Sequence, residues 1–236
     1  MPAKIEALTF DWYGSLAHHR HKVGRGRLLS EYLASHGLQS APWDRRVLYK
    51  VFDFYGDVYK PESSDEEKRI FWIQFTRLLF EQSRVIGATA NQSEVHAAAI
   101  RDIFGSGCFE LYVDVQPVLH ALKRRGLRLG VVSNWHRGLD SFCYEMNLSN
   151  LLDTVISSSD TGIEKPDPSI FDEAVRQLRV KPDRVVHVGD LPEEDFAGAV
   201  AAGLRAILID RGNAHSTHAT RITNLYELER QLQLLM

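Results

Sequence analysis

The chain has 236 residues, of which 44% are hydrophobic and 25% charged, and its formal net charge is −3, which leaves enough apolar material for one elaborated domain or two. Acidic and basic residues are nearly balanced, so the sequence does not predict the basic surface that nucleic-acid binding requires. No stretch approaches about 18 uninterrupted apolar residues and the amino terminus lacks a signal-peptide pattern, so we expect a cytoplasmic protein whose partners include neither nucleic acid nor membrane.

The first predicted strand covers residues 5–10 and is followed directly by Asp11. A carboxylate in that position would be fixed by the strand and exposed at the carboxyl edge of the sheet, where open α/β sheets bind ligands. Gly14 then allows a backbone turn that a side chain would hinder. An aspartate after a strand is also a common turn former or helix cap, so the later motifs have to decide its role.

The pattern changes from strands to helices between residues 18 and 109. Apolar residues recur at helical spacing over four stretches, 28–33, 47–59, 64–79 and 91–104. Ser64 is placed to begin the third helix, and Glu67 completes a capping box with it. We therefore predict a helical insertion after the first strand.

The second predicted strand, residues 127–132, delivers Ser133 and Asn134. A hydroxyl and an amide can both donate hydrogen bonds to an anionic substrate, although both residues are also favoured helix caps. A helix beginning near Trp135 would direct its free amide groups toward the same anion. His136, in the first turn of that helix, is then a candidate for substrate contact.

Lys165 follows the short predicted strand 154–158 and precedes a helical pattern. Pro166 and Pro168 help to hold it in an extended loop. A single lysine is usually a solvated surface charge. Beside a catalytic carboxylate, however, its charge would favour the ionised acid and offset negative charge on a transferring group.

The fourth strand, residues 184–188, ends in Gly189-Asp190, and Asp195 follows five residues later. This arrangement is rich in the oxygen ligands that hard cations such as Mg²⁺ prefer. Glu193 and Glu194 lie in the first turn of the next helix, where acidic residues complement the helix dipole, and we assign them that role alone.

A fifth predicted strand covers residues 205–210, and a closing helix covers 224–235. Strands that alternate with helices indicate an α/β core with three layers, a Rossmann-like parallel sheet between two helical layers. The predicted domains are this core, residues 1–17 and 110–236, and a helical cap domain, residues 18–109.

In this order, the four motifs resemble those of the haloacid dehalogenase (HAD) superfamily. Its members open with an Asp-x-(Asp or other) motif, followed by a Ser/Thr, a Lys and an acidic pair. The resemblance covers residues 4 to about 211, and the helical insertion matches the position of the family's C1-type cap. Closure of such a cap excludes water and brings in the residues that select the substrate.

The resemblance implies a role for each motif. Asp11 corresponds to the nucleophile, and Ser133 and Lys165 correspond to the residues that contact the transferred group. Asp190 corresponds to the Mg²⁺ ligand, and Asp195 would support the metal site directly or through water.

Tyr13 departs from the commonest form of the first motif. Family phosphatases usually carry a second aspartate there, which protonates the leaving group and later activates water. A phenol has a reference pKa of about 10, so it can donate a proton but is a poor base. Metal binding is less affected, because family members use the backbone carbonyl at this position, whatever the side chain.

The Asp-x-Tyr-Gly-Ser opening also resembles the L-2-haloacid dehalogenases, in which the aspartate attacks a carbon and forms an ester without a metal. Those enzymes replace the Gly-Asp of the fourth motif with uncharged residues, whereas this chain keeps Asp190. Two adjacent carboxylates without a cation would repel, and the pKa of one would rise. Arg45 and Arg46 lie where a dehalogenase would place an anion-binding arginine, or on a solvated helix face.

We therefore expect a hydrolase that uses Mg²⁺ to remove phosphate from a small phosphorylated metabolite through an aspartyl-phosphate. Its substrate would contact Tyr13, Asn134 and His136, and the enzyme would be a monomer or a homodimer. One alternative is a metal-independent 2-haloacid dehalogenase that forms an aspartyl ester. The second is a weakly active or non-catalytic binding protein that keeps the fold.

Overall fold

The computed structural model describes residues 4–21, 23–41, 45–88 and 92–234, although not the side chains of residues 45 and 46. The chain divides into two compact units. The sheet unit comprises residues 1–18, 111–135 and 147–236, and the helical unit comprises residues 19–110 and 136–146.

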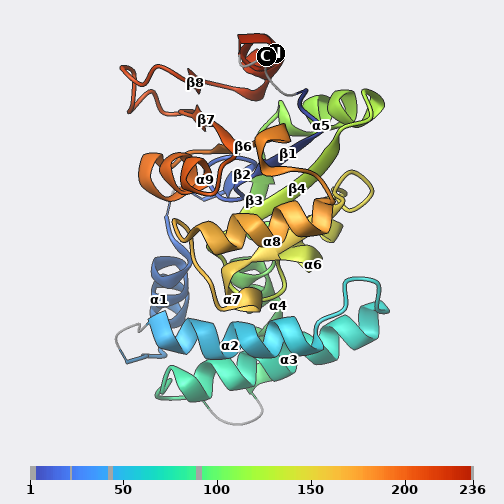
Figure 1. Ribbon diagram of the computed structural model, residues 1–236. Helices are drawn as coiled ribbons and strands as arrows, with labels where there is room; N and C mark the ends of the chain where they lie inside the picture. Colours follow the sequence, from blue (N-terminus) through green and yellow to red (C-terminus); the bar gives the residue numbers. More distant parts are fainter. Residues whose placement is uncertain (1–3, 22, 42–44, 89–91, 235–236) are drawn as a thin grey trace. The chain divides into compact units, whose positions relative to one another are not determined.

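The sheet unit is built on six parallel strands in the order β5-β4-β1-β6-β7-β8 (Figure 1). The strands are β1 (Ala7–Phe10), β4 (Arg128–Ser133), β5 (Thr154–Ser157), β6 (Val185–Gly189), β7 (Arg205–Ile209) and β8 (Arg221–Ile222). Phe10 of β1 pairs with Val131 of β4 on one side and with Val188 of β6 on the other. The carboxyl ends of these three strands therefore lie at the same edge.

β1 and β6 are buried at every position, as expected of a parallel sheet that helices cover on both faces. On one face, Ala7, Val132 and Val185 pack in one apolar cluster with Ile170 and Phe171 of α8. The helices of this unit are α5 (Val115–Arg124), α7 (Ser158–Thr161), α8 (Pro168–Leu178), α9 (Gly198–Ala201) and α10 (Leu228–Leu234). The predicted three-layer α/β core with a Rossmann-like parallel sheet is confirmed.

Two details of the sheet unit differ from the prediction. The sheet has a sixth strand, β8, which has only two residues and is too short to leave an apolar run in the sequence. The closing helix begins with a short 3₁₀ turn, Leu225–Glu227, before α10. Leu235, the predicted end of that helix, lies outside the described residues.

Two short strands, β2 (Ala17–His19) and β3 (Phe109–Leu111), pair in a separate two-stranded sheet. The boundaries between the two units fall within them, at His18/His19 and at Glu110/Leu111. The chain therefore leaves the sheet unit and returns to it through paired segments.

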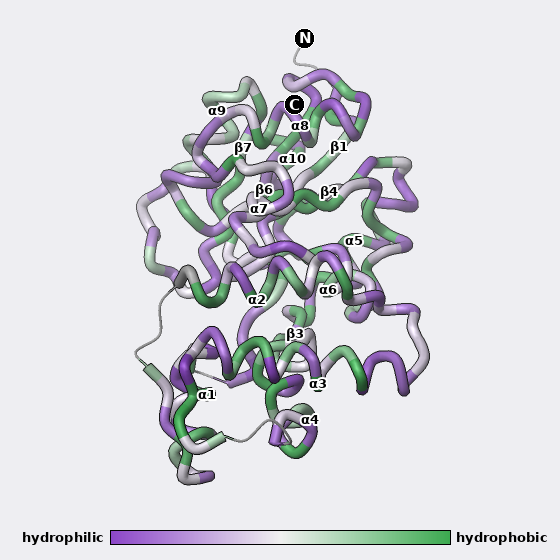
Figure 2. Tube along the Cα trace, turned by 90° about the horizontal axis from the view of Figure 1, so that it is seen from below, coloured by the Kyte–Doolittle hydropathy of each residue, from purple (hydrophilic) through white to green (hydrophobic). Residues whose placement is uncertain are grey.

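The helical unit contains the insertion predicted after the first strand. Its helices are α1 (Arg25–Ser35), α2 (Arg45–Val58), α3 (Asp65–Gln82), α4 (Gln92–Phe104) and α6 (Leu139–Glu145). The predicted capping box at the start of α3 is present, with Ser64 and Glu67 bonded reciprocally. Hydrophobic and hydrophilic residues alternate along α2 and α3 (Figure 2), as expected for helices with one buried face. Asn91, the predicted start of the fourth helix, lies outside the described residues.

Aromatic rings dominate the core of the helical unit. Tyr55 of α2 is fully buried, and its ring lies 5.5 Å from Phe142 of α6 and 6.3 Å from Phe75 of α3. This packing explains why residues 136–146 group with the helical unit although their neighbours in the sequence belong to the sheet unit. Among the described residues, no helix is both long enough and apolar enough to cross a membrane.

Candidate active site

Asp11 lies directly after β1, and 6% of its surface is exposed. Its backbone N–H donates to the carbonyl of Val188, which extends the pairing with β6 by one residue. The side-chain oxygen Oδ1 accepts a hydrogen bond from Ser133 Oγ at 2.9 Å and another from Lys165 Nζ at 2.6 Å. Burial raises the pKa of Asp11, and these two donors oppose the rise.

Lys165 connects two buried carboxylates. Its Nζ lies 2.6 Å from Asp11 Oδ1 and 2.5 Å from Asp195 Oδ1, and the lysine side chain is almost fully buried. Burial opposes the charged form of the lysine, but the two carboxylates outweigh it and raise its pKa. The ammonium group therefore stays protonated and neutralises part of the acidic charge.

Asn134 holds the loop that carries Lys165. Its Oδ1 accepts from the N–H of Lys165 at 2.7 Å, and its Nδ2 donates to the carbonyl of Lys165 and to Glu194 Oε2, each at 2.9 Å. Glu194, to which we assigned only a helix-dipole role, thus also fixes this amide. A hydrogen bond from Asn134 to substrate stays a prediction, and donation by Nδ2 would require replacement of one of its two bonds.

The helix expected to begin near Trp135 begins instead at Leu139. Gly138, at the N-cap of α6, has φ +85°, a left-handed conformation that favours glycine and separates Trp135 from the helix. α6 and its N-terminal amide groups therefore belong to the helical unit, whereas Ser133 belongs to the sheet unit. The prediction of a helix start beside Ser133 was wrong.

Asp190 directly follows β6 and approaches the loop after Asp11. Ser15 Oγ donates to Asp190 Oδ1 at 3.4 Å. Gly14 has φ +88°, and a Cβ atom there would lie 2.3 Å from Asp190 Oδ2, so glycine is required for this approach. Burial raises the pKa of Asp190 to about 7, with further contributions from the negative charges of Asp11 and Asp195.

Asp195 lies in a π-helical segment, Pro192–Ala197, and is buried. Its Oδ2 accepts from the backbone N–H of Leu191 at 2.9 Å. A Cβ atom at position 189 would lie 2.2 Å from Asp195 Cγ, so Gly189 allows the carboxylate to pack against the end of β6. Burial opposes ionisation, but Lys165 and His187 together outweigh it, and the pKa of Asp195 is lowered.

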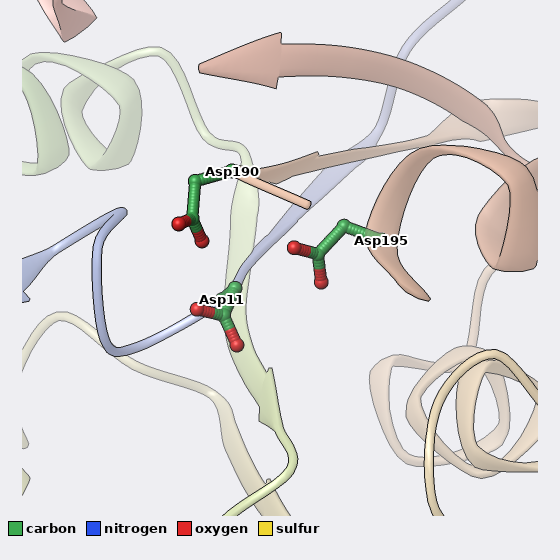
Figure 3. A group of neighbouring side chains, drawn as sticks. All are labelled: Asp11, Asp190 and Asp195. Carbon is green, nitrogen blue, oxygen red and sulfur yellow. The ribbon is translucent and has the colours of Figure 1, made fainter. Parts of the chain in front are cut away.

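The carboxylates of Asp11, Asp190 and Asp195 lie close together, and those of Asp190 and Asp195 are directed toward Asp11 (Figure 3). One oxygen from each lies within 4.8 Å of the others. Oxygen donors of this kind suit a hard divalent cation, and the absence of a side chain at Gly14 keeps Asp190 close to the other two. The residues present therefore fit a Mg²⁺ site.

The loop after Asp11 is anchored by a residue that the sequence analysis did not identify. Arg211 donates to the backbone carbonyl of Ser15 through Nε at 3.0 Å and through Nη2 at 2.8 Å. Its guanidinium group also binds both carboxylate oxygens of the buried Asp114 at 3.0 Å. This bidentate arrangement gives the loop a rigid support.

Tyr13 and Trp135 lie together in the sheet unit. Their ring centroids are 6.3 Å apart with planes inclined by 25°, and 44% of Tyr13 is exposed. The Tyr13 side chain is therefore not part of the buried carboxylate cluster. Its predicted roles, in substrate binding and in metal binding through the backbone carbonyl, stay predictions.

His136 belongs to the helical unit, where its ring stacks on Phe52 with centroids 3.4 Å apart. Its Nδ1 lies 2.8 Å from the carbonyl of Arg137, and burial lowers its pKa well below the ordinary histidine value. Its contact with substrate stays a prediction. The side chains of Arg45 and Arg46 lie outside the described part of the chain.

Sequence reasoning also missed two polar residues inside strands. Thr9 of β1 pairs in register with His187 of β6, and both are fully buried. Thr9 Oγ1 lies 2.9 Å from His187 Nδ1, and His187 Nε2 lies 3.3 Å from Asp195 Oδ1. The available signal was that each polar residue interrupts an otherwise apolar run.

Comparison with known proteins agrees with this geometry. The family model of haloacid dehalogenase-like hydrolases matches residues 5–203. Bovine haloacid dehalogenase-like hydrolase domain-containing protein 3 is 28% identical over 218 residues, which cover 87% of this chain and 82% of the bovine protein. The glyceraldehyde 3-phosphate phosphatase of Methanopyrus kandleri is 35% identical over 130 residues, about half of either chain (52% and 54%).

Two solved structures resemble the whole chain. The 2-haloacid dehalogenase from Pseudomonas syringae pv. Tomato DC3000 has a TM-score of 0.63 and 25% identity, covering 98% of this chain and 100% of that one. The HAD phosphatase from Thermococcus onnurineus has a TM-score of 0.60 and 22% identity, covering 97% and 98%, which supports the fold. With the family model matching from β1 to the end of α9, the chain belongs to the haloacid dehalogenase-like hydrolase family and is a hydrolase.

Proposed function

We propose that this hydrolase is a Mg²⁺-dependent phosphatase that acts on a small phosphorylated metabolite. The observation that carries the proposal is the convergence of three carboxylates, Asp11, Asp190 and Asp195, with Lys165 bonded to two of them. Three acids and one lysine leave a negative charge that a divalent cation would balance. The phosphatases among its relatives, including the phosphoserine phosphatase of Thermus thermophilus at 35% identity over 108 residues, favour the same chemistry.

The ion would be held by Asp11, Asp190 and the backbone carbonyl of Tyr13, with Asp195 acting directly or through water. Bound Mg²⁺ would neutralise the carboxylates and polarise the phosphoryl group. The raised pKa of Asp190 describes the protein without a cation, and its carboxylate would lose its proton when it becomes a ligand.

Asp11 is the proposed nucleophile. Its Oδ1 is occupied by Ser133 and Lys165, whereas Oδ2 receives no hydrogen bond from the described residues. A carboxylate oxygen of Asp11 forms a bond to phosphorus as the bond from phosphorus to the leaving oxygen breaks. Ser133 and Lys165 offset the negative charge of the transferred group, which is the protein's main contribution in phosphoryl transfer.

Hydrolysis of the aspartyl-phosphate completes the cycle when water attacks phosphorus and releases Asp11. Tyr13 can donate a proton to the leaving oxygen in the first step, but the resulting phenolate regains a proton from solvent at neutral pH, and the phenol is then a poor base for activating water in the second step. We therefore expect the second step to be slow. A burst of leaving-group release, followed by slower turnover, would be its kinetic signature.

Metal-independent dehalogenation is the second candidate. It is favoured by Tyr13 and by the likeness to the 2-haloacid dehalogenase structure, at 25% identity. Asp190 opposes it, because the negative charge of Asp11 helps to raise the pKa of Asp190 when no cation is present, and a second carboxylate serves no purpose in attack on carbon. A non-catalytic role is opposed by the contact between Asp11 and Lys165.

A paired assay separates the candidates. Purified protein is given generic phosphoesters with Mg²⁺, and 2-haloacids in the presence of a chelator, and released phosphate and halide are measured. We expect phosphate release that the chelator stops and that added Mg²⁺ restores. Halide release that is insensitive to chelator, without any phosphate release, would establish the dehalogenase instead.

A further inference from the structure

A buried line of hydrogen bonds runs from the middle of the sheet to the proposed nucleophile. It begins at Thr9 and His187, continues through Asp195 and Lys165, and ends at Asp11. Thr9 and His187 are 0% exposed, and Asp195 is 1% exposed. The mechanism proposed above uses the last three residues and leaves the first two without a role.

Strand register places Thr9 and His187 side by side, because these two positions are partners in the β1–β6 pairing. Phe171 of α8 meets the His187 ring edge to face, with centroids 5.0 Å apart and planes at 78°. The imidazole is therefore held by a strand, a hydroxyl and an aromatic ring. A polar pair in this setting must be hydrogen-bonded, since burial of an unpaired donor or acceptor is strongly unfavourable.

The partners on the two ring nitrogens determine the tautomer of His187. Asp195 Oδ1 already accepts from the Lys165 ammonium group, so Nε2, which lies 3.3 Å from the same oxygen, carries the proton of this bond. In a neutral imidazole that carries its proton on Nε2, the other ring nitrogen, Nδ1, is an acceptor. The Thr9 hydroxyl must then be the donor to Nδ1 at 2.9 Å.

We propose that Thr9 and His187 are positioning residues that hold Asp195 in place and thereby keep the Lys165 ammonium group on Asp11. His187 and Lys165 both donate to Oδ1 of Asp195, so the imidazole fixes the oxygen that the lysine must meet. Lys165 can then reach Oδ1 of Asp11 at 2.6 Å. The inference rests on the proposed role of Asp11 as nucleophile.

The first test removes the imidazole donor and then returns it. His187→Phe keeps a flat ring against Phe171 but donates nothing to Asp195, and His187→Gln supplies an amide N–H near the position of Nε2. We expect kcat to fall roughly 10- to 100-fold in His187→Phe, the range expected for a lost bond to a charged group. KM should change little, and His187→Gln should recover most of the loss.

The second test acts on the hydroxyl. Thr9→Val is nearly isosteric and removes the donor to Nδ1, whereas Thr9→Ser keeps it. We expect Thr9→Val to lower kcat about three- to tenfold, as for one neutral hydrogen bond, and Thr9→Ser to retain wild-type kcat.

A control separates positioning from general stability. His96, in the helical unit, is also a buried histidine, 4% exposed, with Nδ1 2.7 Å from the Tyr32 hydroxyl. His96→Phe should lower the melting temperature by an amount similar to that of His187→Phe but leave kcat unchanged. Equal losses of kcat in the two variants would overturn the proposal.

A readout independent of turnover is the tautomer itself. Nitrogen-15 NMR of the histidine side chains reports which ring nitrogen is protonated, and loss of one signal in His187→Gln identifies His187 among the 10 histidines. We expect a neutral ring with a proton on Nε2, shifted in Thr9→Val and restored in Thr9→Ser. A proton on Nδ1 would overturn the inference, whereas absence of phosphatase activity in the wild type would overturn only the proposed function.

Discussion

The two compact units of this protein bury different kinds of side chain. At the carboxyl edge of its strands, the sheet unit buries ionisable groups, Asp11, Lys165 and Asp195, within direct contact of one another. The helical unit buries a cluster of aromatic rings, among them the fully buried Tyr55 and Phe75. The sheet unit therefore buries charge at one edge, whereas the helical unit buries apolar surface.

The energetics of the two arrangements differ. Transfer of charges from water into a protein interior is so unfavourable that a buried ion pair is weak evidence for stability, and apolar residues of similar volume often stabilise as well or better. Burial of aromatic rings removes large apolar areas from water and is stabilising outright. We infer that the aromatic core stabilises the helical unit, whereas the charged cluster of the sheet unit is kept for chemistry at a modest expense in stability.

The sharpest test of this contrast is Asp11→Asn. The amide keeps the shape of the side chain but cannot attack phosphorus, so we expect turnover to fall by at least about a thousandfold. Folding should change little, within about 1 kcal/mol, because Lys165 keeps its bond to Asp195 and one buried charge with a raised pKa is removed. Product formation and thermal unfolding are measured on the same preparation, and near-normal turnover would refute the nucleophile.

The converse test changes the helical core. Phe75→Ala removes a fully buried ring and should lower the free energy of unfolding by about 3–5 kcal/mol. Val95→Ala, at a residue 74% exposed in α4, is the matched control and should stay within about 0.5 kcal/mol. Denaturant titration gives both values. If Phe75→Ala proved as mild as the control, the aromatic cluster would not be the stabilising core that the contrast requires.

The positions of the reactive residues could be predicted because parallel strands end at a common edge. Asp11, Ser133 and Asp190 each follow an apolar run, so the sequence places them together once the sheet is parallel. The order of the motifs then fixes their arrangement. The two-residue strand β8 leaves no comparable run and was missed for that reason.

Contacts that depend on tertiary packing could not be predicted in the same way. The bond from His187 to Asp195 needs both strand register and the π-helical turn at 192–197, neither of which has a periodic signature. Residues 136–146 group with the helical unit because Phe142 packs against Tyr55, a contact between distant parts of the sequence.

The next prediction distinguishes two acidic residues near the same edge. Asp190 belongs to the carboxylate cluster, whereas Glu193 is exposed. Asp190→Asn should lower activity at fixed Mg²⁺ about a hundredfold and raise the Mg²⁺ concentration needed for half-maximal rate, because an amide is a weaker ligand for a hard cation. Glu193→Gln should change both by less than about twofold. Comparable effects in the two variants would mean that the wrong acid had been chosen.

The smallest predicted effect concerns pH. Burial and the neighbouring acids raise the pKa of Asp190 to about 7, so below that pH Mg²⁺ must displace a proton in order to bind. We expect the apparent Kd for Mg²⁺ to rise up to about tenfold for each pH unit below 7 and to be nearly constant above it. Isothermal titration calorimetry at several pH values measures this dependence directly.

The carboxyl group of Asp190 should also make the stability of the metal-free protein depend on pH, in the opposite direction to its effect on Mg²⁺ binding: lower pH weakens Mg²⁺ binding but stabilises the metal-free fold. Because the pKa of Asp190 is higher in the folded protein than in the unfolded chain, the metal-free fold binds its proton more tightly. The contribution of this group to stability is therefore full below the ordinary aspartate range and is lost as pH rises toward 7. Asp190→Asn should abolish that dependence in the metal-free protein, and Glu193→Gln should keep it. If the pH dependence of metal-free stability were the same in Asp190→Asn as in the wild type, the pKa of Asp190 would not be raised in the folded protein. Repulsion among the three carboxylates would then be too weak to support the proposed cation site.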